Sequence, residues 1–113
     1  MLPRVSRLRS AAEFQSTMRL GCKVACPPVV VHARLNDQAV CRAGFIVSKA
    51  VGNAVVRNRV KRQLRHLIAG EFAVAPAKVD VVVRALPKAA SQNLREPVRT
   101  AFATALGKLG AAA

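Results

Sequence analysis

The chain contains no Trp and no Tyr, and Phe occurs only four times in its 113 residues. Because 52% of the residues are nevertheless hydrophobic, we expect a core built mostly from Val, Leu, Ile and Ala. This hydrophobicity excludes intrinsic disorder, which combines high charge with few apolar residues. Single domains typically contain about 100–150 residues. We therefore expect one domain over residues 1–113, with flexible ends at about residues 1–8 and 110–113.

Long apolar segments are missing as well. The longest runs, such as Val29–Val31 and Val81–Val83, have the length of strands, whereas a transmembrane helix needs about 20 apolar residues. The basic N-terminus, Met1–Arg9, is not followed by the apolar stretch of roughly 7–15 residues that a secretory signal requires. These absences predict a cytoplasmic protein, in which thiols stay reduced. The odd number of cysteines and the lack of a CxxC pair predict free thiols at Cys22, Cys26 and Cys41.

Acidic residues are scarce: five Asp and Glu oppose nineteen Lys and Arg, which gives a net charge of +14. Because a folded domain with this charge repels itself, a polyanionic partner is expected. No acid lies between Gln38 and Gly70, where much of the positive charge gathers. The scattered acids also offer no carboxylate pair for acid–base catalysis and no Mg²⁺ site. We predict that the chain holds no catalytic residue and no metal ligand.

The hydrophobic patterns follow one another in the order α-β-β-α-β-α. Ser10 and Glu13 have the spacing of a capping box for the first helix, and the run Val81–Val83 predicts a strand that is covered on both faces. The two strands on either side of Asn36-Asp37 are expected to form an antiparallel hairpin. The predicted helices cover residues 9–20, 54–69 (ended by Gly70) and a segment that begins between 91 and 97, and the predicted strands cover 29–34, 39–48 and 79–85. The fold class is therefore α+β, with a small sheet of three to four strands packed against helices.

The predicted helix at 54–69 has two distinct faces. Its apolar residues have the spacing of a single stripe: Val56, Val60, Leu64 and Leu67. The face opposite this stripe is polar and basic: Asn58, Lys61, Arg62 and Arg65. Arg57 and Arg59 flank the stripe, one on each side. One face of this helix is therefore expected to pack, and the rest to present guanidinium groups.

The absence of acids on this helix favours phosphate as its partner, because guanidinium groups make bidentate contacts with phosphate. A basic face that is merely solvated would alternate charges and gain ion pairs between residues four apart. A membrane-active helix would need a wider and bulkier apolar face. We therefore expect the helix to bind nucleic acid, with a solvated face as the alternative.

One segment of the sequence also resembles a known family. Residues 48–62, SKAVGNAVVRNRVKR, look like the signature of the bacterial ribonuclease P protein subunit, whose hallmark is an Arg-Asn-Arg helix. Arg7–Arg9, Glu13-Phe14 and Arg19–Gly21 are similar to the N-terminal part of the family, and Gly44–Ser48 resembles the strand before the signature. The resemblance covers about residues 5–109.

The resemblance implies a function in RNA processing. Proteins of this family join a catalytic RNA and help to remove the 5′ leader from precursor tRNA. The partners would be that RNA and precursor tRNA, with neither a membrane nor DNA expected. The RNA, not this chain, would hold the catalytic Mg²⁺ ions. The family also implies a left-handed crossover between a strand, the signature helix and the next strand, against the usual right-handed rule.

Carried over by position, the resemblance also names site residues. The candidates for RNA contact are Lys49, Asn53, Arg57, Asn58, Arg59, Lys61, Arg62 and Arg65. A cleft for the single-stranded leader would involve Phe14, Met18 and His32. Met18 and His32 stand where the family commonly has aromatic residues, and Ala50 stands where a second basic residue is common. Bases stack on aromatic rings with about 1–3 kcal/mol each, so weaker or rearranged stacking is expected here.

Several residues have simpler explanations. Phe14 is as well explained by core packing as by a leader cleft, and the other three Phe lie on apolar patterns that predict core positions. His32 and His66 have no acid at a supporting spacing, so we expect them to be packed or solvated rather than catalytic. At the level of the whole chain, the alternatives are a general RNA-structural protein such as a ribosomal component, and a membrane-active cationic protein.

Overall fold

A computed structural model describes residues 2–110 of the chain. The elements are η1 (Arg4–Ser6), α1 (Ala11–Leu20), β1 (Cys22–Cys26), β2 (Val29–Leu35), β3 (Arg42–Val47), α2 (Ala54–Ala73), β4 (Val79–Ala85), η2 (Pro87–Ala90) and α3 (Arg95–Lys108). This arrangement confirms the α+β class. The predicted capping box is present, because Ser10 Oγ accepts from the Glu13 amide while the Glu13 carboxylate accepts from the Ser10 amide.

The sheet has four strands in the order β1-β2-β4-β3. Strands β1, β2 and β4 pair antiparallel, whereas β3 pairs parallel with β4. The predicted hairpin between β2 and β3 is therefore wrong, because β4 lies between them. The valine run of β4 explains this position, since a strand that is apolar on both faces belongs inside the sheet. The partner of β2 in a hairpin is instead β1, a strand that the sequence analysis did not identify.

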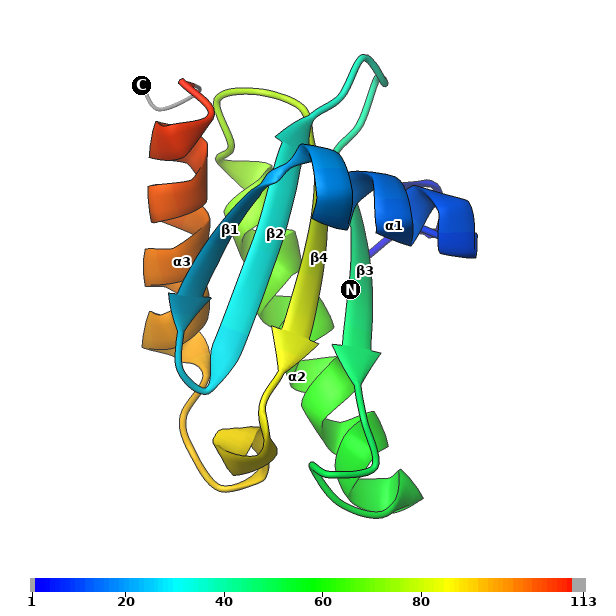
Figure 1. Cartoon of the computed structure of the whole chain (residues 1–113), viewed down its shortest axis with the longest axis vertical. Helices are drawn as coiled ribbons and strands as arrows, with labels where there is room; N and C mark the ends of the chain where they lie inside the picture. The colour runs from blue at the N-terminus through cyan, green and yellow to red at the C-terminus, as the bar shows by residue number, and fades with distance from the viewer. Residues whose placement is uncertain (1, 111–113) are drawn as a thin grey trace.

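Helices cover the two faces of the sheet unequally (Figure 1). On one face α2 and α3 pack against the whole sheet, and on the other α1 crosses only one end of β2 and β4. The core lies under α2 and α3 and includes Val31, Val81, Leu64 and Phe102. Because side chains alternate along a strand, the neighbours of these core valines, such as Val82, point to the face that α1 partly covers.

The connection from β3 through α2 to β4 is left-handed. Strands β3 and β4 run parallel, and α2 passes behind the sheet and returns the chain to the start of β4, on the left of β3 in the view of Figure 1, where the strands point downward. This is the rare hand of a crossover, and it confirms the expectation from the family resemblance. Its consequence is that α2 lies behind the β3 edge of the sheet.

Helix α2 is longer than predicted, because it continues through Gly70 to Ala73. A glycine in the middle of a helix costs only about 0.5–1 kcal/mol relative to alanine. The last turn contains Phe72, whose ring centroid lies 5.9 Å from that of Phe102 in α3. This aromatic contact stabilises the last helical turn. In α3, Pro97 lies in the first turn, as the sequence requires.

The N-terminal segment packs along the β3 edge. Leu2 and Leu8 are 3% and 6% exposed, the Leu8 amide donates to the Ala43 carbonyl at 2.8 Å, and Arg7 forms an isolated parallel bridge with Ala43. The structure thus places residues 2–8 against β3, and the expected flexibility of the two ends stays a prediction. Residues 1 and 111–113, which belong to the ends expected to be flexible, lie outside the described part of the chain.

Candidate nucleic-acid interface

Helix α2 begins at a well-defined cap. The Asn53 side-chain oxygen accepts from the Val56 amide at 3.0 Å, so this predicted RNA-binding residue also starts the helix. A Cβ at Gly52 would lie 2.7 Å from a Val56 methyl group, which explains why glycine precedes the cap. The predicted Lys49 lies just before it, exposed on the loop between β3 and α2. The loop and the cap fix where the first basic turn of α2 emerges.

The two faces predicted for this helix are present. Val60, Leu64 and Ile68 are fully buried against the sheet and α3, and Val56 and Leu67 pack at the margin of the core. The predicted polar residues fall into two groups. Asn58, Arg59 and Arg62 are exposed, and Arg57, Lys61 and Arg65 are half-buried in a row with a spacing of four residues.

Two residues of the half-buried row face a cleft beside β3. Lys61 and Arg65 line this cleft of about 150 Å³ together with Arg7 and Phe14. The Phe14 ring lies so close to Gly44 that any side chain at position 44 would collide with the ring. The structure therefore brings one predicted leader-cleft residue together with two predicted RNA-binding residues of α2, an arrangement that helix periodicity alone does not show.

Met18 and His32 are not part of this cleft. Met18 is half-buried one turn after Phe14, and His32 is 7% exposed in β2, in register with Lys23 and Val82. His32 Nδ1 has no hydrogen-bond partner among the described residues. Burial lowers the pKa of His32, and the charges of Lys23 and Arg84 lower it further. His32 is therefore a neutral, buried imidazole at neutral pH.

The basic residues of α2 are not neutralised within the described chain. The ion pairs among residues 2–110 involve Arg34, Arg42 and Arg99, and none involves a residue of α2. Among the residues that the structure describes, the one polar contact that holds an α2 guanidinium is a hydrogen bond of 2.9 Å from Arg59 to the Ala90 carbonyl in η2. This face of α2 thus keeps its positive charge available for an anion from outside the chain.

Two of the five acids, Asp80 and Glu13, are bound to Arg42 rather than to α2. Asp80 in β4 is fully buried and accepts two hydrogen bonds from Arg42, Nε to Oδ1 at 2.9 Å and Nη2 to Oδ2 at 2.7 Å. Arg42 Nη1 also donates to the Glu13 carboxylate at 2.8 Å, and the Asn36 side-chain Nδ2 donates to Asp80 Oδ1 at 2.7 Å. The hydrogen bonds that Arg42 donates to Asp80 are the largest cause of a raised pKa of Arg42, and the Asp80 charge and the Glu13 carboxylate raise it further.

This network was not predicted from the sequence; it joins Arg42, Asp80, Glu13 and Asn36. A signal was nevertheless present, because an Asp inside a valine-rich central strand must find a cationic partner in order to be buried. Since Glu13 caps α1, the network ties α1 to β3 and β4. It therefore holds Phe14, the next residue of α1, over the sheet.

Residues 2–110 contain neither a cluster of metal ligands nor a helix suited to span a membrane. No group of three or more His, Cys, Asp or Glu side chains in this range is placed to hold a metal ion. Within the same range, no helix combines the length and the apolar character of a membrane span. All three cysteines are free, and Cys41 is buried.

Known proteins are similar to this chain in sequence and in fold. The Ribonuclease P family matches residues 2–110. The ribonuclease P protein component of Kocuria rhizophila is 49% identical over 109 residues, which cover 94% of this chain and 96% of that protein. The corresponding protein of Acidothermus cellulolyticus is 43% identical, over 96% and 92% of the two chains.

Solved structures of more distant relatives have the same architecture. The ribonuclease P protein of Staphylococcus aureus superimposes with a TM-score of 0.74 at 27% identity, over 94% of this chain and 96% of that one. The protein from Thermotoga maritima gives a TM-score of 0.73 at 27% identity, over 83% and 92%. The similarity therefore extends to most of the chain and to both faces of the sheet.

Proposed function

The chain belongs to the ribonuclease P protein family, and we propose that it acts as the protein component of the ribonuclease P ribonucleoprotein. In this role it binds the catalytic RNA and the 5′ leader of precursor tRNA, and it assists removal of the leader in the cytoplasm. The observation that carries the proposal is the basic face of α2, which has no acidic partner among residues 2–110. The fold presents this face at a sheet edge, where a large RNA has access to it.

The exposed groups of α2 suit contact with a folded RNA. Arg62 and Asn58 project from the helix without a protein partner in the described chain, and Arg59 is held at a fixed position by its bond to Ala90. Guanidinium groups bind phosphate bidentately and cannot lose their charge at physiological pH. Each phosphate contact releases counterions from the RNA, which supplies a large part of the binding free energy.

The cleft beside β3 suits a single strand. Lys61, Arg65 and Arg7 line it with positive charge, and the half-buried Phe14 ring offers an apolar surface. Proteins that bind single-stranded nucleic acid combine such a charged groove with aromatic surfaces for base stacking. Phe45 of β3 also lines the cleft but packs partly against the core, and His32 is buried in β2, so base stacking would rest mainly on Phe14.

The chemistry of cleavage belongs to the RNA in this proposal. The catalytic RNA would hold the Mg²⁺ ions that activate the attacking water and stabilise the leaving oxygen. The protein would contribute affinity and position through α2 and the cleft, and it would supply no nucleophile. Ribonuclease P activity would then be a property of the ribonucleoprotein as a whole.

Reconstitution tests the proposal. The protein alone should cleave nothing, and it should stimulate cleavage of precursor tRNA by the catalytic RNA at low Mg²⁺ concentration. Failure to stimulate at any protein concentration would reject the function. A general RNA-structural protein is the alternative, and it is distinguished on the assembled complex. Leader-bearing precursor should compete better than mature tRNA if the protein binds the leader, and equally well if it does not.

A further inference from the structure

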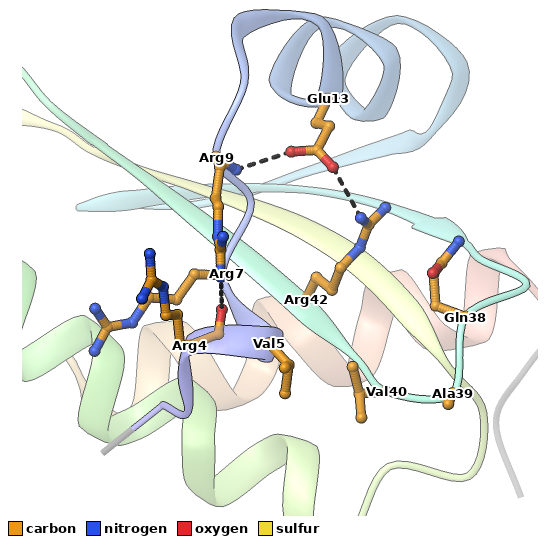
Figure 2. A pocket seen from close by; sticks show the side chains of 9 residues that line it. All are labelled: Arg4, Val5, Arg7, Arg9, Glu13, Gln38, Ala39, Val40 and Arg42. Carbon is orange, nitrogen blue, oxygen red and sulfur yellow. Dashed lines mark hydrogen bonds and ion pairs between the residues drawn. The ribbon is translucent and has the colours of Figure 1, made fainter.

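A second basic hollow lies on the far side of the N-terminal segment from the α2 cleft. It has a volume of about 480 Å³ and lies between residues 4–9 and the loop that joins β2 to β3 (Figure 2). Its charged lining residues are Arg4, Arg7, Arg9, Arg42 and Glu13, and Val5 and Val40 supply an apolar wall. Neither the signature helix nor the predicted leader cleft includes this hollow.

The charges in the hollow do not cancel. The single acid, Glu13, accepts from the amides of Arg9 and Ser10 and from Arg42, so its oxygens are already occupied. Arg42 is likewise held by Asp80. The guanidinium groups of Arg4, Arg7 and Arg9 remain, and none of them forms an ion pair within residues 2–110.

The partners that these arginines do have are weak acceptors. Arg7 Nη2 donates to the Leu2 carbonyl and Arg9 Nη2 to the Arg4 carbonyl, each at 3.2 Å. Neutral carbonyls at this distance orient a guanidinium without neutralising it. Arg7 Nε is buried and has no hydrogen-bond partner in the described chain. In Figure 2 the Arg4 and Arg7 side chains extend together to one side of the N-terminal segment, away from Val5 and Val40, whereas the Arg9 side chain runs along the segment to the Arg4 carbonyl.

The backbone that carries these arginines is fixed before any ligand binds. Residues 4–6 form a short 3₁₀ turn, and the Ser6 amide donates to the Pro3 carbonyl at 2.9 Å. Leu2 and Leu8 are buried on either side of the turn, and Leu8 is hydrogen-bonded to β3. A preorganised site loses less conformational entropy on binding, which favours affinity.

The hollow is also continuous with the interface already described. Arg7 lines both this hollow and the cleft that contains Lys61 and Arg65. Positive charge therefore runs from α2, across the N-terminal segment, to Arg4 and Arg9. An anion that extends over this whole strip must itself be long and charged at regular intervals.

We propose that Arg4, Arg7 and Arg9 form a second phosphate-binding surface, which takes the sugar–phosphate backbone of RNA and extends the α2 interface around the β3 edge. The proposal rests on the proposed function of the chain. The forked guanidinium donors suit phosphate oxygens, and no aromatic residue is among the described residues that line the hollow, so the surface would contact the RNA backbone rather than the bases. The phosphates belong either to the catalytic RNA or to the leader, and the experiment separates these sources.

The test compares two double variants. Arg4→Gln with Arg9→Gln removes two charges from the hollow while leaving the half-buried Arg7 in place. Arg95→Gln with Arg99→Gln removes the same charge from exposed positions of α3, which are not among the residues that line the hollow. Thermal unfolding confirms that both variants are folded. Arg4→Lys with Arg9→Lys keeps the charge and should restore most of the binding.

Binding to the catalytic RNA alone is measured first, over a range of salt concentrations. Loss of two phosphate contacts should weaken binding by roughly 10–100-fold near 0.1 M salt and reduce the log–log salt slope by about 1.4–1.8. The affinity and the salt slope of the Arg95/Arg99 control variant should change clearly less. This result would support the proposal and assign the phosphates to the catalytic RNA.

The second arm uses the assembled complex with leader-bearing precursor and with mature tRNA. A loss seen only with the precursor would support the proposal and assign the phosphates to the leader. If the wild type binds and the Arg4/Arg9 variant binds as well as the α3 control in both arms, the inference is overturned. The proposed function then still stands. A wild type that binds neither RNA overturns the proposed function, and this inference falls with it.

Discussion

Arg42 donates two hydrogen bonds to the buried carboxylate of Asp80, from Nε to Oδ1 at 2.9 Å and from Nη2 to Oδ2 at 2.7 Å. Asp80 is fully buried, while the Arg42 side chain is 19% exposed. Arg42 also reaches Glu13 at the cap of α1. One guanidinium thus joins the parallel pair β3–β4 to the helix that covers the other face of the sheet.

Replacing Arg42 with Met should destabilise the fold strongly. The change leaves Asp80 as a buried charge without its main partner, and breaking such a pair costs about 3–5 kcal/mol. The free energy of unfolding is measured by urea titration. Arg34→Met is the matched control, because Arg34 lies 3.8 Å from Asp80 and is more exposed, and it should cost less than about 1 kcal/mol. Equal costs for the two variants would show that Arg42 does not hold Asp80 in place.

Acidification should destabilise the protein through His32. Burial lowers the pKa of this histidine in the folded state below its ordinary value of 6.5, so the unfolded state binds the proton more readily. The stability that His32 contributes is present above pH 6.5 and is lost as the pH falls through the folded pKa. His32→Gln, which cannot take up a proton, should flatten the dependence of unfolding free energy on pH below 6.5. Parallel curves for variant and wild type would contradict this assignment.

Phe14→Ala separates the two explanations of this ring. If Phe14 stacks on a leader base, the variant should lose about 1–3 kcal/mol of affinity for leader-bearing precursor, which corresponds to roughly 5–150-fold, and none for mature tRNA. If Phe14 serves only to pack against Gly44, both substrates should be bound as before and only the free energy of unfolding should fall. Phe14→Leu keeps the apolar contact with Gly44 and serves as the control for packing.

The salt dependence of RNA binding measures how much of α2 is in contact. Five basic residues on this helix, each meeting one phosphate, predict a log–log slope of roughly −3.5 to −4.5. The residues are Arg57, Arg59, Lys61, Arg62 and Arg65. Filter binding or fluorescence anisotropy at several salt concentrations gives the slope. A flat response would mean that the basic helix is not the surface that meets RNA.

The sequence predicted the elements that have a strong local pattern. The apolar stripe predicts helix α2, and the consecutive valines predict strand β4. Strand β1 was missed because Cys22–Cys26 is short and has weak alternation, and it owes its place to pairing with β2. The false hairpin between β2 and β3 arose because Asn36-Asp37 suits a turn, although only the tertiary fold decides that β4 separates the two strands.

The candidate site was predictable in composition but not in arrangement. Periodicity placed the arginines of α2 away from the core, and the structure agrees. It could not show that Lys61 and Arg65 share a cleft with Phe14, because these residues meet only through the crossover of α2 behind β3. The packing of the N-terminal segment on β3, which brings Arg7 to the same cleft, depends equally on long-range contacts.

Charge reversal on α2 tests the central claim most directly. Arg59→Glu with Arg62→Glu places two negative charges on the exposed face of α2 and leaves its buried stripe intact, and Arg95→Glu with Arg99→Glu makes the same change in charge on α3. The account predicts that the α2 variant folds, as judged by circular dichroism and thermal unfolding, but fails to bind the catalytic RNA, whereas the α3 variant still binds. A folded α2 variant that binds the catalytic RNA as tightly as the α3 variant would contradict the account.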